Sequence, residues 1–362
     1  MSHVITVKEN ELPIYDIHIE KDYGQLYKAL EMLKITNGKV CIVSDTNISV
    51  HYISEVSNLV KEYAKDVKTY TLTPGEEHKN LSTVNALYEF LIESKFDRQD
   101  LLIALGGGVV GDLTGYTAAT YLRGIRFIQM PTSLLAMVDS SIGGKTGVDF
   151  LAYKNMIGAF HQPKEVYINL STLFTLSDEQ FYSGFGEVIK YGLITDPEYY
   201  QWLKDNASRI LSKDMVALEE MIVRSCENKR VVVEKDPTEQ GDRALLNFGH
   251  TIGHSVEKLM DFKLLHGNCV SIGMVAASYL SFLRGNITKE ELDDIIETLK
   301  LYHLPTTITK LNIDEIIDAT KNDKKMEAGN IKFILLQTIG HAIIDKTVTD
   351  LEMKQAIEFI ME

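Results

Sequence analysis

Cysteine is scarce in this sequence, and its few cysteines are widely spaced. Three occur in 362 residues, Cys41, Cys226 and Cys269, and no two of them form a Cys-x-x-Cys pair. Disulfide scaffolds and thiolate metal sites both need closely spaced cysteines. The sequence therefore excludes both and indicates a reducing compartment.

Long apolar runs are also missing. The most apolar window, residues 101–122, is interrupted by six glycines or acidic residues, so it is not a plain membrane span. The first 20 residues lack the charged segment followed by an apolar run that marks a secretory signal. We expect a cytoplasmic protein that does not bind a membrane.

Positive charge is in deficit. Lysine and arginine number 37 against 51 acidic residues, which gives a net charge of −14. Such a surface repels nucleic acid and anionic lipid, so an anionic substrate would need a local basic pocket. The hydrophobic content of 45% is ordinary for a globular enzyme, and the length suggests two domains.

Short apolar strands alternate with helices in the first half of the chain. This alternation predicts a mostly parallel sheet covered on both faces, with ligands gathering beyond the carboxyl ends of its strands. From residue 177 the pattern is helical, apart from one strand pair. We expect an α/β domain over 1–175 and an all-α domain over 176–362. The expected strands are an edge hairpin at 4–7 and 14–19, then 39–44, 68–72, 101–105 and 126–130, and the late pair 331–336 and 342–344.

A glycine-rich turn follows one of these strands. Residues 106–112, GGGVVGD, match Gly-x-Gly-x-x-Gly between a strand and a helix, where backbone amides can approach a pyrophosphate. Glycine turns of this kind also exist for packing alone. The position after a later strand, with Met130-Pro131 where an acidic residue is usual, is unlike the ordinary dinucleotide fingerprint. Asp45, at the end of an earlier strand, could hold a ribose instead.

A second glycine-rich segment resembles part of a phosphate-binding loop. Residues 143–146 read GGKT, but Asp139 stands where the Walker A motif requires glycine, so we reject that motif. Lys145, Lys154 and Asn155 remain on what we interpret as a loop. They are either solvated surface or a cage for phosphate or carboxylate.

Three histidines lie close together in the second half. His250 and His254 share one helix face, and His266 follows a turn. Glu187 lies on an otherwise apolar helix face, one turn from Lys190. The histidines could be buried or capping side chains, and Glu187–Lys190 could be a structural ion pair. Imidazole and carboxylate are also the ligands of a catalytic divalent metal, which Glu187 would complete.

Several segments taken in order resemble the 3-dehydroquinate synthase family: LGGGVVGDLTGY, YLRGIRFIQMPTSLLAMVDSSIGGKTGVD, KNMIGAFHQP, GEVIKYG, LLNFGHTIGHSVE, LLHG and DKK. The resemblance runs over nearly the whole chain. It implies an α/β nucleotide-binding domain followed by a helical domain, an active site in the interdomain cleft, and a homodimer. It also implies NAD and one divalent metal, zinc or cobalt.

The resemblance assigns Glu187, His250 and His266 to the metal. It leaves His254 to the substrate, whereas the helical spacing alone made His254 a ligand. Asn268 departs from the family, which often has an acidic residue there, and this bears on how His266 is oriented. The implied NAD residues are Asp45, Asn47, Glu76, Lys79, Gly107, Gly108, Val109, Val110, Gly111, Asp112, Thr132, Ser133, Lys145, Lys154, Thr172, Leu173, Phe174 and Thr175.

The remaining roles concern the substrate and the proton transfers. Arg123 resembles the arginine that family members lend across the dimer interface. The implied substrate residues are Arg123, Lys145, Asn155, Lys190, Lys229, Arg243, Asn247, His254 and one of Lys324 and Lys325. The implied catalytic residues are Asp139, Lys145, Lys190, Lys229 and His254.

The implied substrate is 3-deoxy-D-arabino-heptulosonate 7-phosphate, a sugar-phosphate acid. The implied reaction is transient oxidation by NAD, β-elimination of phosphate, re-reduction and an intramolecular aldol closure, giving 3-dehydroquinate. Two alternatives are a metal-dependent alcohol dehydrogenase or sibling cyclase, and an inactive nucleotide-binding protein. Net NADH accumulation would favour a dehydrogenase, and a purified protein without metal would favour the inactive protein.

Overall fold

The computed structural model describes residues 2–361 except 152, 310, 322–325 and 328–329, so the expected substrate residues Lys324 and Lys325 lie outside the described residues. The chain divides into two compact units. Unit 1 comprises Met1–Leu176 and Lys229–Pro237, and unit 2 comprises Ser177–Asn228 and Thr238–Glu362. Helix α7 (Met215–Lys235) therefore contributes residues to both units.

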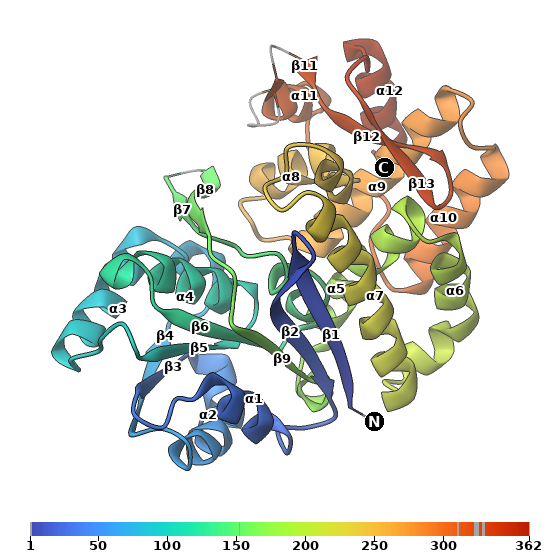
Figure 1. The fold of residues 1–362 in the computed structure, drawn as a ribbon. Coiled ribbons are helices and arrows are strands. Elements are labelled where there is room, and N and C mark those ends of the chain that lie inside the picture. The colour runs from blue at the N-terminus through green and yellow to red at the C-terminus, as the bar shows by residue number, and fades with distance from the viewer. Residues whose placement is uncertain (1, 152, 310, 322–325, 328–329, 362) are drawn as a thin grey trace. The chain divides into compact units, whose positions relative to one another are not determined.

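Unit 1 is built on a seven-stranded sheet with the order β1-β2-β9-β6-β5-β3-β4 (Figure 1). The edge strand β1 pairs antiparallel with β2, and every other neighbouring pair is parallel, which confirms the expected mostly parallel sheet. The strands are β1 (His3–Glu9), β2 (Leu12–Glu20), β3 (Lys39–Asp45), β4 (Asp66–Leu72), β5 (Leu101–Gly106), β6 (Arg126–Pro131) and β9 (Glu165–Asn169).

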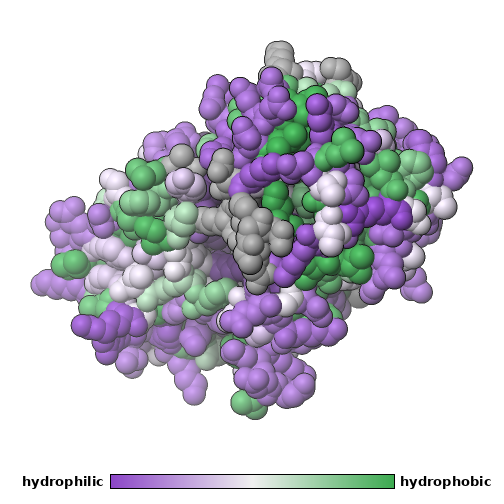
Figure 2. Space-filling view, turned by 90° about the horizontal axis from the view of Figure 1, so that it is seen from above, coloured by the Kyte–Doolittle hydropathy of each residue, from purple (hydrophilic) through white to green (hydrophobic). Residues whose placement is uncertain are grey.

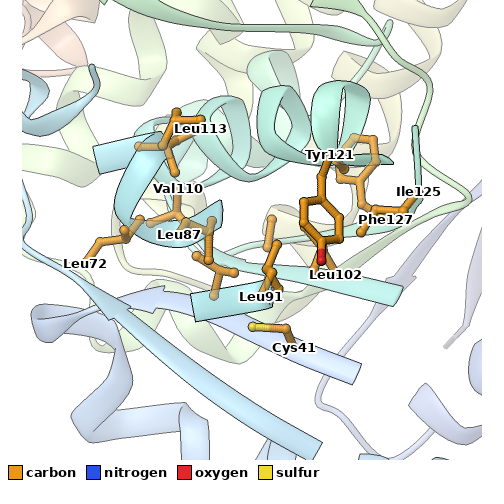
Figure 3. Close-up of a cluster of buried hydrophobic side chains, with 14 of the residues drawn as sticks. Cys41, Leu72, Leu87, Leu91, Leu102, Val110, Leu113, Tyr121, Ile125 and Phe127 are labelled. Carbon is orange, nitrogen blue, oxygen red and sulfur yellow. The ribbon is translucent and has the colours of Figure 1, made fainter. Parts of the chain in front are cut away.

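Helices cover both faces of this sheet because its central strands are apolar on both sides. Along β3, Val40 and Ile42 pack with α1 (Leu26–Leu33) and α2 (Thr46–Lys61), whereas Cys41 and Val43 face α3 (Leu81–Glu93) and α4 (Gly108–Thr120). Figure 3 shows the second of these cores, in which side chains from the sheet and from both helices point toward one another.

The strand order sets where a ligand can bind. β3 has β4 on one side and β5 on the other. Successive strands are therefore added toward one edge of the sheet up to β4 and toward the other edge from β5 onward, although β3 and β5 themselves are parallel. The parallel register that pairs Val43 with Ala104 brings Asp45 and Gly106 to the same edge. In open α/β sheets this reversal point is where nucleotides bind.

The segment that the sequence analysis interpreted as a glycine-rich loop is a hairpin outside the main sheet. It consists of β7 (Lys145–Phe150) and β8 (Tyr153–Phe160), which pair antiparallel. A Cβ atom on Gly158 would lie 2.4 Å from the carbonyl oxygen of Thr146. The loop interpretation was wrong for Lys145, Lys154 and Asn155, because the chain turns before them, at Gly143 (φ +94°) and Gly144 (φ +67°). Gly158 instead allows the two strands to approach closely.

Unit 2 is mainly helical and is packed around α9 (His266–Leu283), which α5, α8, α10, α12 and β12 all contact. The expected late strand pair is confirmed as β12 and β13, so hairpins accompany the helices. The elements are α5 (Asp178–Ile194), α6 (Pro197–Leu211), α8 (His250–Leu259), α10 (Lys289–Leu301), α11 (Ile313–Lys321), α12 (Asp350–Ile360), β10 (Met326–Glu327), β11 (Asn330–Ile331), β12 (Phe333–Thr338) and β13 (His341–Asp345).

The face of the molecule shown in Figure 2 is mainly polar, as the charged content of 24% leads one to expect. Hydrophilic residues dominate the face seen in Figure 2, with smaller apolar groups between them. Among the described residues, no helix has both the length and the apolar content needed to cross a bilayer.

Candidate metal centre and nucleotide turn

Glycines let the helices that carry the metal candidates approach backbone to backbone. A Cβ atom on Gly186 of α5 would lie 2.4 Å from the carbonyl oxygen of Gly267 in α9. A Cβ atom on Gly273 of α9 would lie 1.8 Å from the carbonyl oxygen of Gly249, which precedes α8. Gly249 itself has φ +79°, a conformation that glycine adopts without strain. The glycines around these motifs therefore bring α5, α8 and α9 together.

Glu187, His250 and His266 converge where these helices meet. One ligand atom from each lies within 4.8 Å of the others. Oε1 of Glu187 is 3.5 Å from Nε2 of His250 and 3.7 Å from Nε2 of His266. This oxygen is buried and has no hydrogen-bond partner among the described residues. A buried, unsatisfied carboxylate oxygen facing two imidazole nitrogens fits a divalent cation.

The other ring nitrogens of both histidines have partners. Nδ1 of His250 is 3.1 Å from the carbonyl oxygen of Phe248, and Nδ1 of His266 is 3.5 Å from Oε1 of Glu257. Burial opposes the charged form of His266, but the nearby carboxylates of Glu187 and Glu257 outweigh it and raise the pKa to about 9. Such partners fix a ring, and here they leave Nε2 of both histidines facing Oε1 of Glu187.

Glu257 is a functional candidate that the sequence analysis missed. It is 3% exposed and belongs to a second group with His254 and His266 whose ligand atoms also lie within 4.8 Å. Its place three residues after His254, on the same helix face, was the available signal. The sequence analysis left open how His266 is oriented beside Asn268, and Glu257 supplies that orientation.

Lys190 and His254 lie beside this cluster. Lys190 is buried and forms an ion pair with Oε2 of Glu187, the oxygen that does not face the histidines. The rings of His250 and His254 have centroids 5.1 Å apart, as their shared helix face predicts. Of the other expected substrate residues in unit 2, Arg243 is buried and the side-chain amide of Asn247 donates to Glu239 at 2.7 Å.

The glycine turn of unit 1 begins α4. Gly107 is the N-cap residue and provides no side-chain cap, so the first amides of the helix are available to an anion. A Cβ atom on Gly111 would lie 2.7 Å from Oε1 of Gln129 in β6, so this glycine permits close packing of helix on sheet. Thr132 follows β6 beside the turn, and its buried hydroxyl has no hydrogen-bond partner among the described residues. Open amides and an unsatisfied hydroxyl together fit a phosphate-bearing ligand.

An ion-pair network lies next to this turn. Nζ of the buried Lys79 is 2.9 Å from Asp112 and 3.3 Å from Glu76, and Lys154 is 3.4 Å from Glu76. Burial opposes the charge on Lys79, but the two carboxylates outweigh it and raise its pKa. Burial also raises the pKa of Asp112. Four expected NAD residues from three segments thus meet in one network.

The remaining expected NAD residues have local structural roles. Asp45 caps α2 by accepting from the amides of Asn47 and Ile48. Thr172, Leu173, Phe174 and Thr175 lie in or directly after the short helix η4 (Leu170–Phe174), where Phe174 is 52% exposed. Lys145 is exposed on β7 and Ser133 follows β6.

Two further expected residues meet in unit 1. Nζ of Lys229 in α7 donates to the carbonyl oxygen of Asp139 at 2.5 Å and to its carboxylate at 2.8 Å. The sequence offered no sign of this pairing across 90 residues. Arg123 is exposed at φ +66° next to Leu122 at φ +50°, so two side chains in succession hold a left-handed backbone. Asn155, also expected to bind substrate, is exposed on β8.

Two family models match adjoining segments of the chain. The 3-dehydroquinate synthase N-terminal model matches residues 69–183, and the C-terminal model matches residues 184–326. Curated relatives agree. A 3-dehydroquinate synthase of Acetivibrio thermocellus is 43% identical over 336 residues, 93% of each chain. One of Hydrogenovibrio crunogenus is 46% identical over 312 residues, 86% of this chain and 87% of its own.

Solved structures share the fold. A 2-epi-5-epi-valiolone synthase from Streptomyces hygroscopicus, with NAD+ and Zn2+ bound, is 27% identical and superposes with a TM-score of 0.88 over 99% of both chains. A 2-deoxy-scyllo-inosose synthase with carbaglucose-6-phosphate, NAD+ and Co2+ is 22% identical, with a TM-score of 0.86 over 98% of this chain and 99% of its own.

Proposed function

The chain belongs to the 3-dehydroquinate synthase family, and from this we propose how its residues carry out that family's reaction. The reaction converts 3-deoxy-D-arabino-heptulosonate 7-phosphate to 3-dehydroquinate and phosphate in the shikimate pathway. The relatives that bear this name are 40–46% identical to the chain, whereas the valiolone synthase is 27% identical. This difference favours the dehydroquinate substrate over those of the sibling cyclases.

The proposal rests on one observation: His250 and His266 both face Oε1 of Glu187, a buried carboxylate oxygen without a hydrogen-bond partner among the described residues. We propose that these three side chains hold the divalent metal. When bound, the metal supplies positive charge that lowers the pKa of a coordinated substrate hydroxyl. The Phe248 carbonyl and Glu257 orient the two imidazoles, and Lys190 compensates the second oxygen of Glu187.

We propose that unit 1 binds NAD and that unit 2 holds the metal. The amides at Gly107–Asp112 bind the pyrophosphate, assisted by the Thr132 hydroxyl and the Lys79 network. NAD, when bound, supplies a reversible hydride acceptor, so it is regenerated in each turnover. We assign NAD binding to the expected domain 1–175 and metal binding to the expected domain 176–362. Lys229–Pro237 lies in the second range but groups with unit 1.

The substrate carries a carboxylate and a phosphate, and both need cationic partners in a chain of net charge −14. We propose that Lys229, held by Asp139, binds one of these anions through its ammonium group. His254, beside both histidines proposed as metal ligands, accepts or donates a proton at its imidazole. The other proposed substrate contacts are Arg123, Lys145, Asn155, Lys190, Arg243 and Asn247.

The test is a balance of products. Purified chain with zinc, substrate and a small amount of NAD is expected to release one phosphate per substrate consumed, with no net NADH. Phosphate release must continue after the amount of phosphate released has far exceeded the amount of NAD supplied. The His250→Ala variant is expected to lose both bound metal and phosphate release. Accumulating NADH without phosphate would instead identify a dehydrogenase.

We also propose a cytoplasmic homodimer. All three cysteines are free thiols, which is usual in a reducing compartment. Arg123 is exposed in a strained turn, where it can reach a second subunit.

A further inference from the structure

A second cluster of ionisable side chains lies in unit 1, and none of its members belongs to the proposed active site. Asp16 and His18 of β2 and Glu165 of β9 each offer one ligand atom, and these atoms all lie within 4.8 Å of one another.

The sheet places these three side chains on one face. In the parallel pairing of β2 and β9, Asp16 lies opposite Glu165, and His18 follows two residues along the same strand. Glu165 is the first residue of β9, whereas the glycine-rich turn at residues 106–112, proposed to bind the nucleotide, follows the carboxyl end of β5. Because β9, β6 and β5 are parallel, the cluster lies toward the opposite edge of the sheet from the nucleotide turn.

His18 and Glu165 are buried, Asp16 is half-buried, and polar atoms of the two buried members are incompletely satisfied. His18 is 8% exposed and Glu165 is 4% exposed. Nε2 of His18 and Oε1 of Glu165 contact each other as an ion pair, but neither has a hydrogen-bond partner beyond this contact among the described residues. Two carboxylates share one imidazole, so the cluster carries surplus negative charge. Burying such charge is costly unless a cation compensates it.

Neighbouring residues orient the cluster without neutralising it. The hydroxyl of Thr6 in β1 donates to Oδ1 of Asp16 at 2.6 Å. An outer hydrogen bond of this kind commonly holds a carboxylate that ligates a metal. Glu20, further along β2, accepts a hydrogen bond from Ser2 and adds more negative charge nearby. Within the described ranges, no lysine or arginine forms an ion pair with Asp16, His18 or Glu165.

We propose that Asp16, His18 and Glu165 form a second divalent metal site of the zinc type. One imidazole nitrogen and two carboxylate oxygens suit zinc, whose two charges balance the two carboxylates beside a neutral imidazole. The ion joins residues 149 positions apart in the sequence, since it links position 16 to position 165. In the part of the chain that the structure describes, β2 lies between β1 and β9 in the sheet. The site therefore fastens the amino-terminal hairpin to β9 within unit 1 and is structural.

The experiment counts zinc in the full-length chain. Protein stripped with a chelator is dialysed against zinc alone, and bound zinc is measured by mass spectrometry. Wild type is expected to bind two ions per chain and His250→Ala one. Adding Glu165→Gln to His250→Ala is expected to weaken the remaining site at least tenfold. Zinc should raise the thermal unfolding midpoint of His250→Ala but not of the double variant.

Glu165→Gln keeps the shape of the side chain, and His18→Asn serves as an independent variant in case one of them misfolds. His341→Asn, at an exposed histidine of β13, is the matched control and should retain two ions. A wild type that binds one zinc and loses it in His250→Ala would overturn the proposal. Retention of the second zinc in Glu165→Gln and His18→Asn would also overturn it. Neither result depends on which reaction the active site catalyses.

Discussion

Glu257 is placed to control the proposed metal cluster from outside it. It lies 3.5 Å from Nδ1 of His266, whose Nε2 faces Glu187. Replacing Glu257 with glutamine keeps the size of the side chain but removes its charge. We expect zinc affinity to fall about 10- to 100-fold while the chain stays folded.

Zinc titration of the chelator-stripped protein measures this change. The control is Glu297→Gln, at an exposed glutamate of α10, which should leave the affinity unchanged. Unchanged affinity in Glu257→Gln would mean that the backbone alone orients His266.

Residue type and spacing alone pointed to Glu187 and the three histidines as candidates, because histidine and buried carboxylate are uncommon on an apolar helix. The choice of His266 over His254 came from the family resemblance. Glu257 could not be identified in the same way. A glutamate on an amphipathic helix usually faces solvent, and its partner His266 lies beyond a turn whose geometry the sequence does not specify. The pairing of Asp139 with Lys229 was hidden for the same reason, since 90 residues separate them.

At the scale of elements, the contact between α5 and α9 depends on glycine. A Cβ atom on Gly267 would lie 1.7 Å from the carbonyl oxygen of Ser183, so Gly267→Ala must push the two helices apart. We expect the variant to lose about 3 kcal/mol of unfolding free energy, at the upper end for overpacking. Zinc binding should weaken with it, because the displaced helices carry Glu187 and His266.

Denaturant unfolding and zinc titration measure the two effects. Gly285→Ala is the control, because its Cβ atom would meet nothing within 4 Å although φ is +72°. That control should cost about 1 kcal/mol through backbone strain alone and should leave zinc binding intact. Equal costs at both positions would contradict the proposed helix contact.

The junction of α9 and α12 predicts a dependence on pH. Arg284, at the end of α9, forms two hydrogen bonds of 3.0 Å to the carboxylate of Glu352, which also belongs to the capping box of α12. The hydrogen bonds from Arg284 lower the pKa of Glu352 from 4.5 to about 2. Partial burial acts against this change, and hydrogen bonds from Thr349 lower the pKa further. A lowered pKa means that the charged form stabilises the folded state above the unfolded pKa.

We therefore expect Glu352→Gln to cost about 1 kcal/mol of unfolding free energy at neutral pH, a modest value because the pair is partly exposed. The difference from wild type should persist down to about pH 4.5 and vanish as the pH falls toward 2. Denaturant unfolding at several pH values measures it. A difference that stays constant over this range would show that the charge of Glu352 is not responsible.

Most of the element order was predictable, because alternating strands and helices leave a strong periodic signal. The β7–β8 hairpin was not, since its glycines resemble those of a loop until the partner strand is known. Neighbours within the sheet were equally hidden. Only the fold brings β3 beside β5, and with them Asp45 beside the nucleotide turn.

For the whole molecule, the proposed dimer makes a prediction about mixed subunits. If Arg123 acts in its partner's active site, a dimer of one Arg123→Ala chain and one His250→Ala chain contains one intact site. Each variant alone should be inactive. Random mixing should restore about a quarter of the wild-type phosphate release, because half of the dimers are mixed and each has one good site of two.

Phosphate release after denaturing and refolding the mixture together measures this recovery. Two Arg123→Ala preparations mixed in the same way should remain inactive. No recovery would place Arg123 in the active site of its own chain.

Helix α7 has a consequence for how this protein could be divided. Its last turns, Lys229–Lys235, group with unit 1 although they follow more than 50 residues of unit 2, and they include the lysine that holds Asp139. A polypeptide stopped after Leu176 would lack that segment, and the complementary piece would carry it with nothing to pack against. Separate expression of the two halves should therefore yield poorly folded fragments. Two polypeptides made from a gene split at this point would have to associate with each other before either could fold fully.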